Sequence, residues 1–150
     1  MPNPSIPPSD HVVRWCKASE IDRDTGEVGP GPFLLSPKDT DGGISVNWLE
    51  HCHPTDLEAQ LQEVREVLAK KMKKISVDSR LARLNIGRAI ASVAESSGGV
   101  VIIDVVHSPE EEPGRWIDAS HALVSGLTID DEASAVSLRD SILGTYVANS

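Results

Sequence analysis

The sequence predicts an α+β fold: a single domain with a mixed, mostly antiparallel sheet and two to three helices packed mainly on one face. Three observations support this prediction. Short apolar runs separated by turns rich in Gly, Pro and Asp occupy residues 11–49 and are typical of strands. An apolar pattern with a helical period covers residues 55–74. After it, short strand-like and helix-like segments alternate, and this order of elements favours the α+β class.

Size and charge limit the possible functions. The 150 residues have the usual length of one domain, and we expect residues 11–150 to form it. The net charge of −9, from 23 acidic and 14 basic residues, disfavours nucleic acid as a partner, because phosphate attracts cationic surfaces. The sequence has no apolar run of roughly 18 residues that would predict a membrane span, and its first residues lack the pattern of a secretory leader. We therefore expect a cytoplasmic protein whose two cysteines are reduced.

The first elements are a tail and three strands. Residues 1–10 contain four prolines, which fix the backbone and remove amide donors. We predict a disordered tail there, and the alternative is a polyproline segment that docks elsewhere on the protein. Strands are predicted at residues 11–17, 33–35 and 44–49, where apolar side chains alternate or cluster between turn residues.

A helix over residues 55–74 is the most clearly marked element. Thr55 and Glu58 have the spacing of a capping box, in which the hydroxyl and the carboxylate each bind a free backbone amide of the first turn. Leucine and valine then recur at helical intervals from Leu57 to Leu68 and form one apolar stripe. The lysines at the end of the segment suit the negative end of the helix dipole.

Four further elements are predicted around one apolar run in the second half. They are a strand at residues 81–86, a short helix at 88–96, an edge or return strand at 122–124 and a last helix at 132–143. The run itself, residues 100–106, is the most β-branched stretch of the chain and is bounded by Gly and Pro, which predicts a strand. Because both of its faces are apolar, we expect it at the centre of the sheet, covered on both sides.

Polar residues at the end of this run admit two interpretations. The carboxylate of Asp104 needs a partner if it is buried, and we expect a neighbouring arginine; the alternative is an acid or base role beside a histidine. Asp118, Ser120 and His121 contain the residue types of a catalytic triad, but closeness in sequence does not define one. We expect Asp118 and Ser120 to close a turn. The lysine-rich and acidic runs elsewhere are interpreted as solvated surface.

Three consecutive residues, His51, Cys52 and His53, carry side chains that can bind a metal. Zinc takes about four such ligands, and neighbouring side chains on a strand point to opposite faces. The spacing of a known metal motif is missing. We therefore expect a polar loop before the helix, with neither a metal nor another cofactor.

Three sequence blocks carry a resemblance. HVVRWC at residues 11–16, SVNWLE at 45–50, and SHA at 120–122 followed by GL at 126–127 resemble blocks in a group of small uncharacterised bacterial proteins. The resemblance covers most of residues 10–130 and implies a bacterial soluble domain without an assigned activity. If the blocks meet in space, they form one polar cluster, whose members are His11, Arg14, Cys16, Asn47 and His121.

We expect this protein to bind another protein, as a protein-binding or accessory module within a larger complex. Neither a cofactor loop nor a metal motif nor an activated nucleophile is recognisable. The predicted contact residues are Trp48, Arg115 and Trp116, because interfaces are enriched in Trp and Arg.

Two alternatives are kept beside this function. One is a hydrolase or transferase that uses His11, Arg14, Cys16 and His121 as its catalytic groups. The other is an acidic mimic of nucleic acid, which requires carboxylates arrayed on one face. Assembly into a homo-oligomer is left open.

Overall fold

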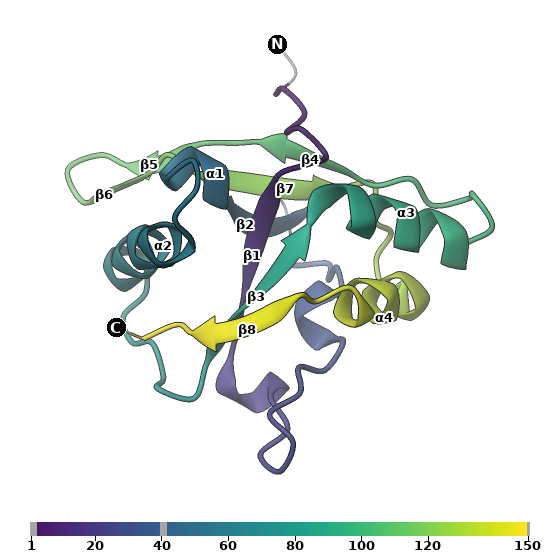
Figure 1. Cartoon of the computed structure of the whole chain (residues 1–150), viewed down its shortest axis with the longest axis horizontal. Helices are drawn as coiled ribbons and strands as arrows, with labels where there is room; N and C mark the ends of the chain where they lie inside the picture. Colours follow the sequence, from purple (N-terminus) through teal and green to yellow (C-terminus); the bar gives the residue numbers. More distant parts are fainter. Residues whose placement is uncertain (1–2, 40–41, 150) are drawn as a thin grey trace.

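The computed structural model describes residues 3–39 and 42–149, and its main sheet has helices on both sides (Figure 1). Six strands form the sheet in the order β4–β7–β2–β1–β3–β8, and all five pairings are antiparallel. Their bounds are β1 His11–Cys16, β2 Ile44–Trp48, β3 Arg80–Asn85, β4 Asp104–His107, β7 His121–Ser125 and β8 Gly144–Val147. The predicted α+β class and the single domain are confirmed.

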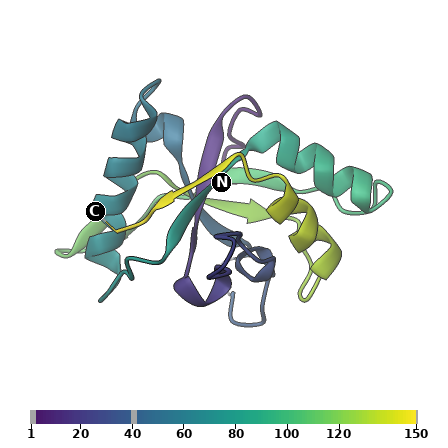
Figure 2. The ribbon, with the colours of Figure 1, turned by 60° about the horizontal axis from the view of Figure 1, so that its bottom comes forward.

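Two successive residues of the central strand β1 show how the helices are distributed. Val12 belongs to a core cluster with residues of α3 and α4, whereas Val13 belongs to a second cluster with residues of α2. Neighbouring residues of a strand point to opposite faces, so the two clusters lie on opposite faces of the sheet. Figure 2 shows α2 on one side and α3 and α4 on the other. The helices are α1 Leu49–Cys52, α2 Leu57–Lys71, α3 Ile86–Ser96 and α4 Glu132–Asp140, with 3₁₀ turns η1 Ala18–Glu20 and η2 Gly31–Phe33.

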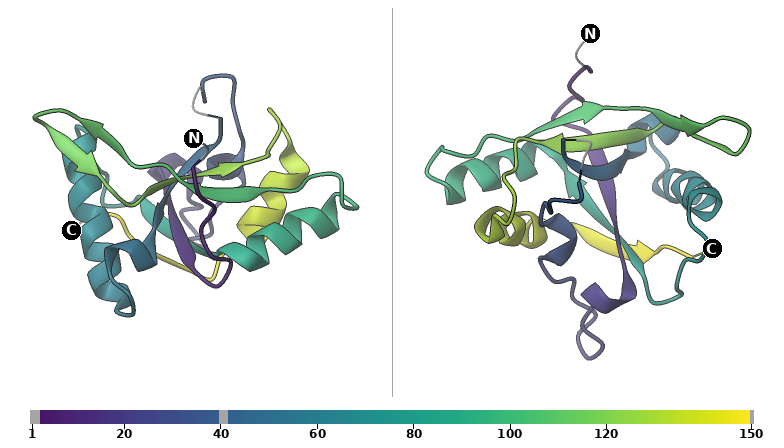
Figure 3. Two further views of the ribbon diagram at one scale, coloured as in Figure 1. Left: turned by 90° about the horizontal axis from the view of Figure 1, so that it is seen from above. Right: turned by 180° about the vertical axis from the view of Figure 1, so that it is seen from behind.

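A hairpin of two short strands, β5 Glu110–Glu112 and β6 Trp116–Asp118, prolongs the β4–β7 pair beyond the sheet (Figures 1 and 3). The last pair of β4 and β7 is His107 with Ala122, and the first pair of the hairpin is Glu110 with Asp118. Two residues lie between these pairs on the β4–β5 side and three on the β6–β7 side. Such an unequal count is a bulge, which bends and twists the strands. The sequence predicts only a loop in this place.

The apolar run at residues 100–106 does not lie at the centre of the sheet. Only its end enters β4, which is an edge strand, and Val100 and Ile102 are 84% and 60% exposed. The N-terminal segment covers the outer edge of β4: the amide of Ile6 donates to Val105 O at 2.9 Å. Ile6 itself is buried. The prediction of a disordered tail is therefore wrong for residues 3–10, and the docking alternative holds there; residues 1–2 lie outside the described residues.

Other element boundaries differ from their predictions for local reasons. The predicted strand at 33–35 overlaps the 3₁₀ turn η2, which Pro30 and Pro32 favour. The predicted edge strand at 122–124 is β7, an internal strand between β4 and β2. The last helix ends at Asp140 instead of residue 143, and β8 starts soon after it. In the described part of the chain, no helix has the length and apolarity needed to cross a membrane.

The start of α2 is capped one residue later than predicted. Asp56 has an extended backbone, and its side chain accepts the amide of Ala59 at 3.3 Å, so Asp56 replaces Thr55 as the cap. His53 Nδ1 accepts the amide of Asp56 at 3.0 Å, and the His53 carbonyl accepts the side-chain amide of Gln60 at 2.7 Å. His53 therefore shapes the turn into the helix.

Candidate functional site

The four residues of the predicted catalytic group lie on different faces of the sheet. Arg14 and Cys16 share the face of β1 that α3 and α4 cover, whereas His11 points to the other face. His121 also lies on the other face, because its strand neighbour Ala122 belongs to the α3–α4 cluster. The structure therefore does not bring Cys16 next to either histidine.

Each of these residues already has partners of its own. His11 Nδ1 lies 2.7 Å from the carboxylate of Glu50. Arg14 donates to the carbonyls of Pro32 at 2.8 Å and Ser45 at 3.0 Å. Cys16 is fully buried, and burial raises the pKa of its thiol to about 12, so the thiol stays protonated at neutral pH. The nearby charge of Arg14 lowers the pKa of this thiol but does not offset its burial, so the thiol is not activated as a nucleophile.

The three predicted metal-binding candidates diverge in space. His53 shapes the turn before α2, Cys52 Sγ donates to the Trp48 carbonyl at 3.5 Å, and the exposed ring of His51 lies 5.0 Å from the ring of His107. Within residues 3–39 and 42–149, metal-binding side chains do not gather in any group of three or more. Cys52 and Cys16 are free thiols in opposite core clusters, and burial raises the pKa of Cys52 to about 11.

Trp48 is half-buried, and its ring is held by contacts within the fold. Its indole Nε1 donates to Asp10 at 2.9 Å, and its ring meets that of His107 edge-on at 5.2 Å. It packs against the α3–α4 core cluster. Trp48 therefore ties β2 to the N-terminal segment.

A cluster of buried and half-buried polar side chains lies at the base of the β5–β6 hairpin. Lys71 Nζ, at the end of α2, lies 2.7 Å from Asp118 Oδ2 and 2.7 Å from Glu110 Oε1. The Asp118 side chain is 1% exposed and that of Lys71 17%. Burial alone lowers the pKa of Lys71, but its hydrogen bonds to the two carboxylates outweigh burial and raise the pKa above its usual value. Lys71 therefore stays charged and joins the helix to both strands of the hairpin. We call these three residues the Lys71 triad.

A second layer of polar side chains fixes the triad from the sheet. Asn47 Nδ2 donates to Asp118 Oδ1 at 2.8 Å and to Ser120 Oγ at 3.0 Å. His121 Nδ1 lies 2.6 Å from the carbonyl of Ser108. A carbonyl only accepts, so Nδ1 carries the proton, and in the neutral ring Nε2 accepts the hydroxyl of Ser45 at 3.0 Å. Every group of this layer therefore has a partner, as a structural network requires.

The opposite side of the hairpin faces outward. Ile117 pairs with Glu111 and is 70% exposed, and the Arg115 side chain is 70% exposed beside Glu112. The Trp116 ring is half-buried, with Lys71 Nζ 4.9 Å from its centroid. Of the three predicted contact residues, Arg115 and Trp116 thus lie on the hairpin, whereas Trp48 is half-buried against the α3–α4 core cluster.

Sequence reasoning missed most of this cluster. Lys71 lies in a run of lysines, Glu110 in a run of glutamates, and both runs are interpreted as solvated surface. The partners of Lys71 are 39 and 47 residues away in the chain, which no local pattern reveals. A hairpin prediction over residues 110–118 would have been the useful signal, because it sets Glu110 opposite Asp118, and two facing carboxylates need a cation between them.

Comparison of the chain with protein-family models, with curated proteins and with solved structures finds no match. The resemblance of the three sequence blocks therefore stays a prediction.

Proposed function

We propose that this protein is a binding module for another protein and that the β5–β6 hairpin is its recognition element. The observation that carries the proposal is a projecting hairpin that an ion-pair network holds on its inner side and that exposes one large apolar residue, Ile117, on its outer side. The Lys71 triad fixes the inner side, and Ile117 lies on the outer side with 70% of its surface exposed. Arg115 and Trp116 precede Ile117 in the chain, Arg115 exposed and Trp116 half-buried on the inner side, and both belong to the residue types that dominate binding energy in interfaces.

Rigidity is the reason to assign recognition to this element. An isolated two-stranded hairpin is at best marginally stable in water. Here the turn at Pro113-Gly114, where Gly114 has a φ of 80°, closes the hairpin, and Arg115 N donates to Glu112 O at 2.9 Å. An element that is ordered before binding loses less conformational entropy when it binds.

The proposal includes an accessory role within a complex in the cytoplasm. The protein's two thiols, Cys16 and Cys52, are free and lie on opposite faces of the sheet, so they cannot pair with each other inside the chain. Such an arrangement suits a reducing compartment.

Site-specific photocrosslinking in the organism that encodes the protein tests the proposal. A benzophenone amino acid is placed at Ile117 and, as the matched control, at Val77, which is exposed to a similar degree at 67%. We expect a defined covalent adduct with one protein from position 117 and none from position 77. The adduct protein, once purified, should bind the wild-type chain and lose at least tenfold in affinity for Ile117→Asp, about 1.4 kcal/mol. Equal adducts from both positions, or unchanged affinity of Ile117→Asp, would refute the proposal.

A further inference from the structure

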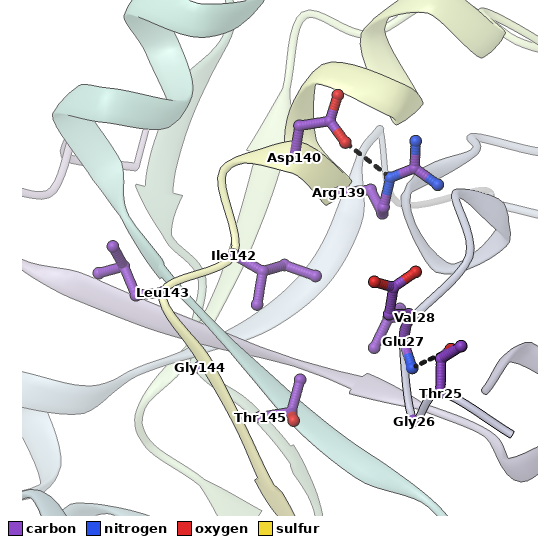
Figure 4. Close-up of a pocket in the computed structure, with 10 residues that line it drawn as sticks. All are labelled: Thr25, Gly26, Glu27, Val28, Arg139, Asp140, Ile142, Leu143, Gly144 and Thr145. Carbon is purple, nitrogen blue, oxygen red and sulfur yellow. Dashed lines mark hydrogen bonds and ion pairs between the residues drawn. The ribbon is translucent and has the colours of Figure 1, made fainter. Parts of the chain in front are cut away.

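A groove lies on the side of the molecule remote from the hairpin, along the outer edge of β8 (Figure 4). Its volume is about 500 Å³. One wall is formed by Ile142, in the segment that joins α4 to β8, and by Thr145 in β8 itself, and the other by residues Thr25–Val28. In Figure 4 the Ile142 side chain points across the groove toward Val28. We call this space the β8 groove.

The backbone of β8 has free hydrogen-bonding groups in this groove. β8 is the last strand of the sheet and pairs only with β3. The amide of Ala148 donates to Ser79 O at 3.3 Å, which makes Arg80 and Val147 a pair without mutual hydrogen bonds. In an antiparallel ladder, pairs with and without mutual hydrogen bonds alternate. Thr145 lies two residues from Val147 and so also belongs to a pair without mutual hydrogen bonds, with Ala82. Its amide and carbonyl therefore point away from β3. The outward carbonyl of Val147 accepts Arg65 Nε at 2.8 Å.

The facing wall is fixed in place before any ligand arrives. Val28 is buried in the α3–α4 core cluster. Asp22 Oδ1 accepts the amides of Asp24 at 2.8 Å and Thr25 at 3.1 Å, and the Asp22 amide donates to Glu27 O at 2.9 Å. The groove is therefore a preformed slot between an ordered turn and an open strand edge, a geometry suited to an added strand.

Charge indicates what kind of strand fits. Glu27 and Asp140 line the groove, and Glu20 and Asp22 line the hollow that continues it past Arg139. Among the residues that line these two hollows, four are acidic and one, Arg139, is basic; its Nε is bound to Asp140 at 2.8 Å. We infer that the β8 groove binds an extended, cationic peptide segment of a partner as an additional strand on β8. A second copy of this chain is disfavoured as the occupant, because β8-to-β8 pairing would bring two equally acidic rims together.

A defined peptide probe tests this inference independently of the hairpin. The probe is the blocked heptapeptide Lys-Val-Lys-Val-Lys-Val-Lys, titrated to about 1 mM into the ¹⁵N-labelled protein and followed by amide chemical shifts, which report millimolar affinities. We expect shifts at Val28 and at residues 144–147. The same peptide with Glu for Lys should bind at least tenfold more weakly. No shifts, shifts confined to other residues, or equal binding of the acidic peptide would overturn the inference.

Variants of the protein separate backbone pairing from charge. Thr145→Pro removes the outward amide but no bond to β3, as proline at a strand edge does, and should weaken binding at least tenfold. Glu27→Gln with Asp140→Asn should weaken binding at least threefold, whereas the control Glu111→Gln, on the hairpin, should have no effect. If Thr145→Pro does not fold, a probe N-methylated at alternate residues replaces it. Two outcomes would contradict the inference. One is unchanged affinity for Thr145→Pro or for the N-methylated probe. The other is a wild-type dimer in sedimentation that Thr145→Pro abolishes.

Discussion

Replacing Lys71 by Met is the sharpest test of the proposed joint between α2 and the hairpin. The substitution keeps the length and apolar stem of the side chain but removes the cation that lies 2.7 Å from Asp118 and 2.7 Å from Glu110. In this variant the Asp118 carboxylate, which is 1% exposed, has lost the cation that it pairs with. The hydrogen bond from Asn47 remains. Removing one partner of a buried ion pair costs about 3–5 kcal/mol.

The expected loss lies at the lower end of that range. The Glu110 side chain is 37% exposed and can be rehydrated, so mainly Asp118 is left uncompensated. We predict a decrease of about 3 kcal/mol in the free energy of unfolding. For a chain of this size each kcal/mol corresponds to roughly 2–4 °C, so the melting temperature should fall by about 6–12 °C.

Urea titration and calorimetry measure this difference, and two further variants define its cause. Lys70→Met, at the adjacent exposed position, should change stability by less than about 0.5 kcal/mol. Lys71→Met combined with Asp118→Asn removes both charges and keeps the hydrogen bond from Asn47, so it should recover most of the loss. If Lys71→Met is as mild as Lys70→Met, or if the double variant is no better than the single one, the buried triad is not what holds the hairpin.

Three other predictions follow from the fold. Ile6→Ala should cost about 2–3 kcal/mol in urea titrations and Ile102→Ala close to nothing, because Ile6 is 4% and Ile102 60% exposed; equal losses would contradict the docked tail. Asp56→Ala should cost about 1 kcal/mol and Thr55→Ala clearly less, a difference that thermal melts can resolve and that would reverse if Thr55 were the cap. Burial raises the pKa of the Cys16 thiol from 9.0 to about 12, so its contribution to stability is complete below pH 9 and is lost as pH rises toward 12. Measurements of the free energy of unfolding against pH should show a loss of about 4 kcal/mol over this range, and Cys16→Ala should not show it.

Local patterns predicted the elements whose signals are complete within a few residues. The stripe from Leu57 to Leu68 and the polar residues before it are sufficient to predict α2, although the cap is Asp56 and not the predicted Thr55, and alternation is sufficient for β1 and β2. The composition of a strand does not specify its neighbours. The run at residues 100–106 has the β-branched composition of a central strand, but the edge position of β4 is decided by β7, which lies between it and β2, and by the tail on its other side.

The candidate site was less predictable than the fold, because its contacts are long-range. His11 pairs with Glu50 and Asn47 with Asp118, 39 and 71 residues apart. The predicted polar cluster of His11, Arg14, Cys16, Asn47 and His121 required the three sequence blocks to meet in space and to turn these side chains to one face. Alternation along β1 separates His11 from Arg14 and Cys16, so blocks that are adjacent in the sheet still present their polar groups on opposite sides.

The two proposed binding elements differ in how their order is maintained, and this difference predicts how they respond to change. The hairpin projects from the sheet and depends on a single cation, Lys71, so loss of that charge should loosen Ile117 without altering the hydrophobic core. The β8 groove lies between a buried residue, Val28, and a strand of the main sheet, so its shape should persist until the domain unfolds. Amide hydrogen exchange distinguishes them: in Lys71→Met, protection at residues 144–147 should fall by no more than the loss in global stability, whereas residues 110–118 should also open locally and lose more protection. An equal loss in both segments would mean that the hairpin opens only when the whole domain unfolds.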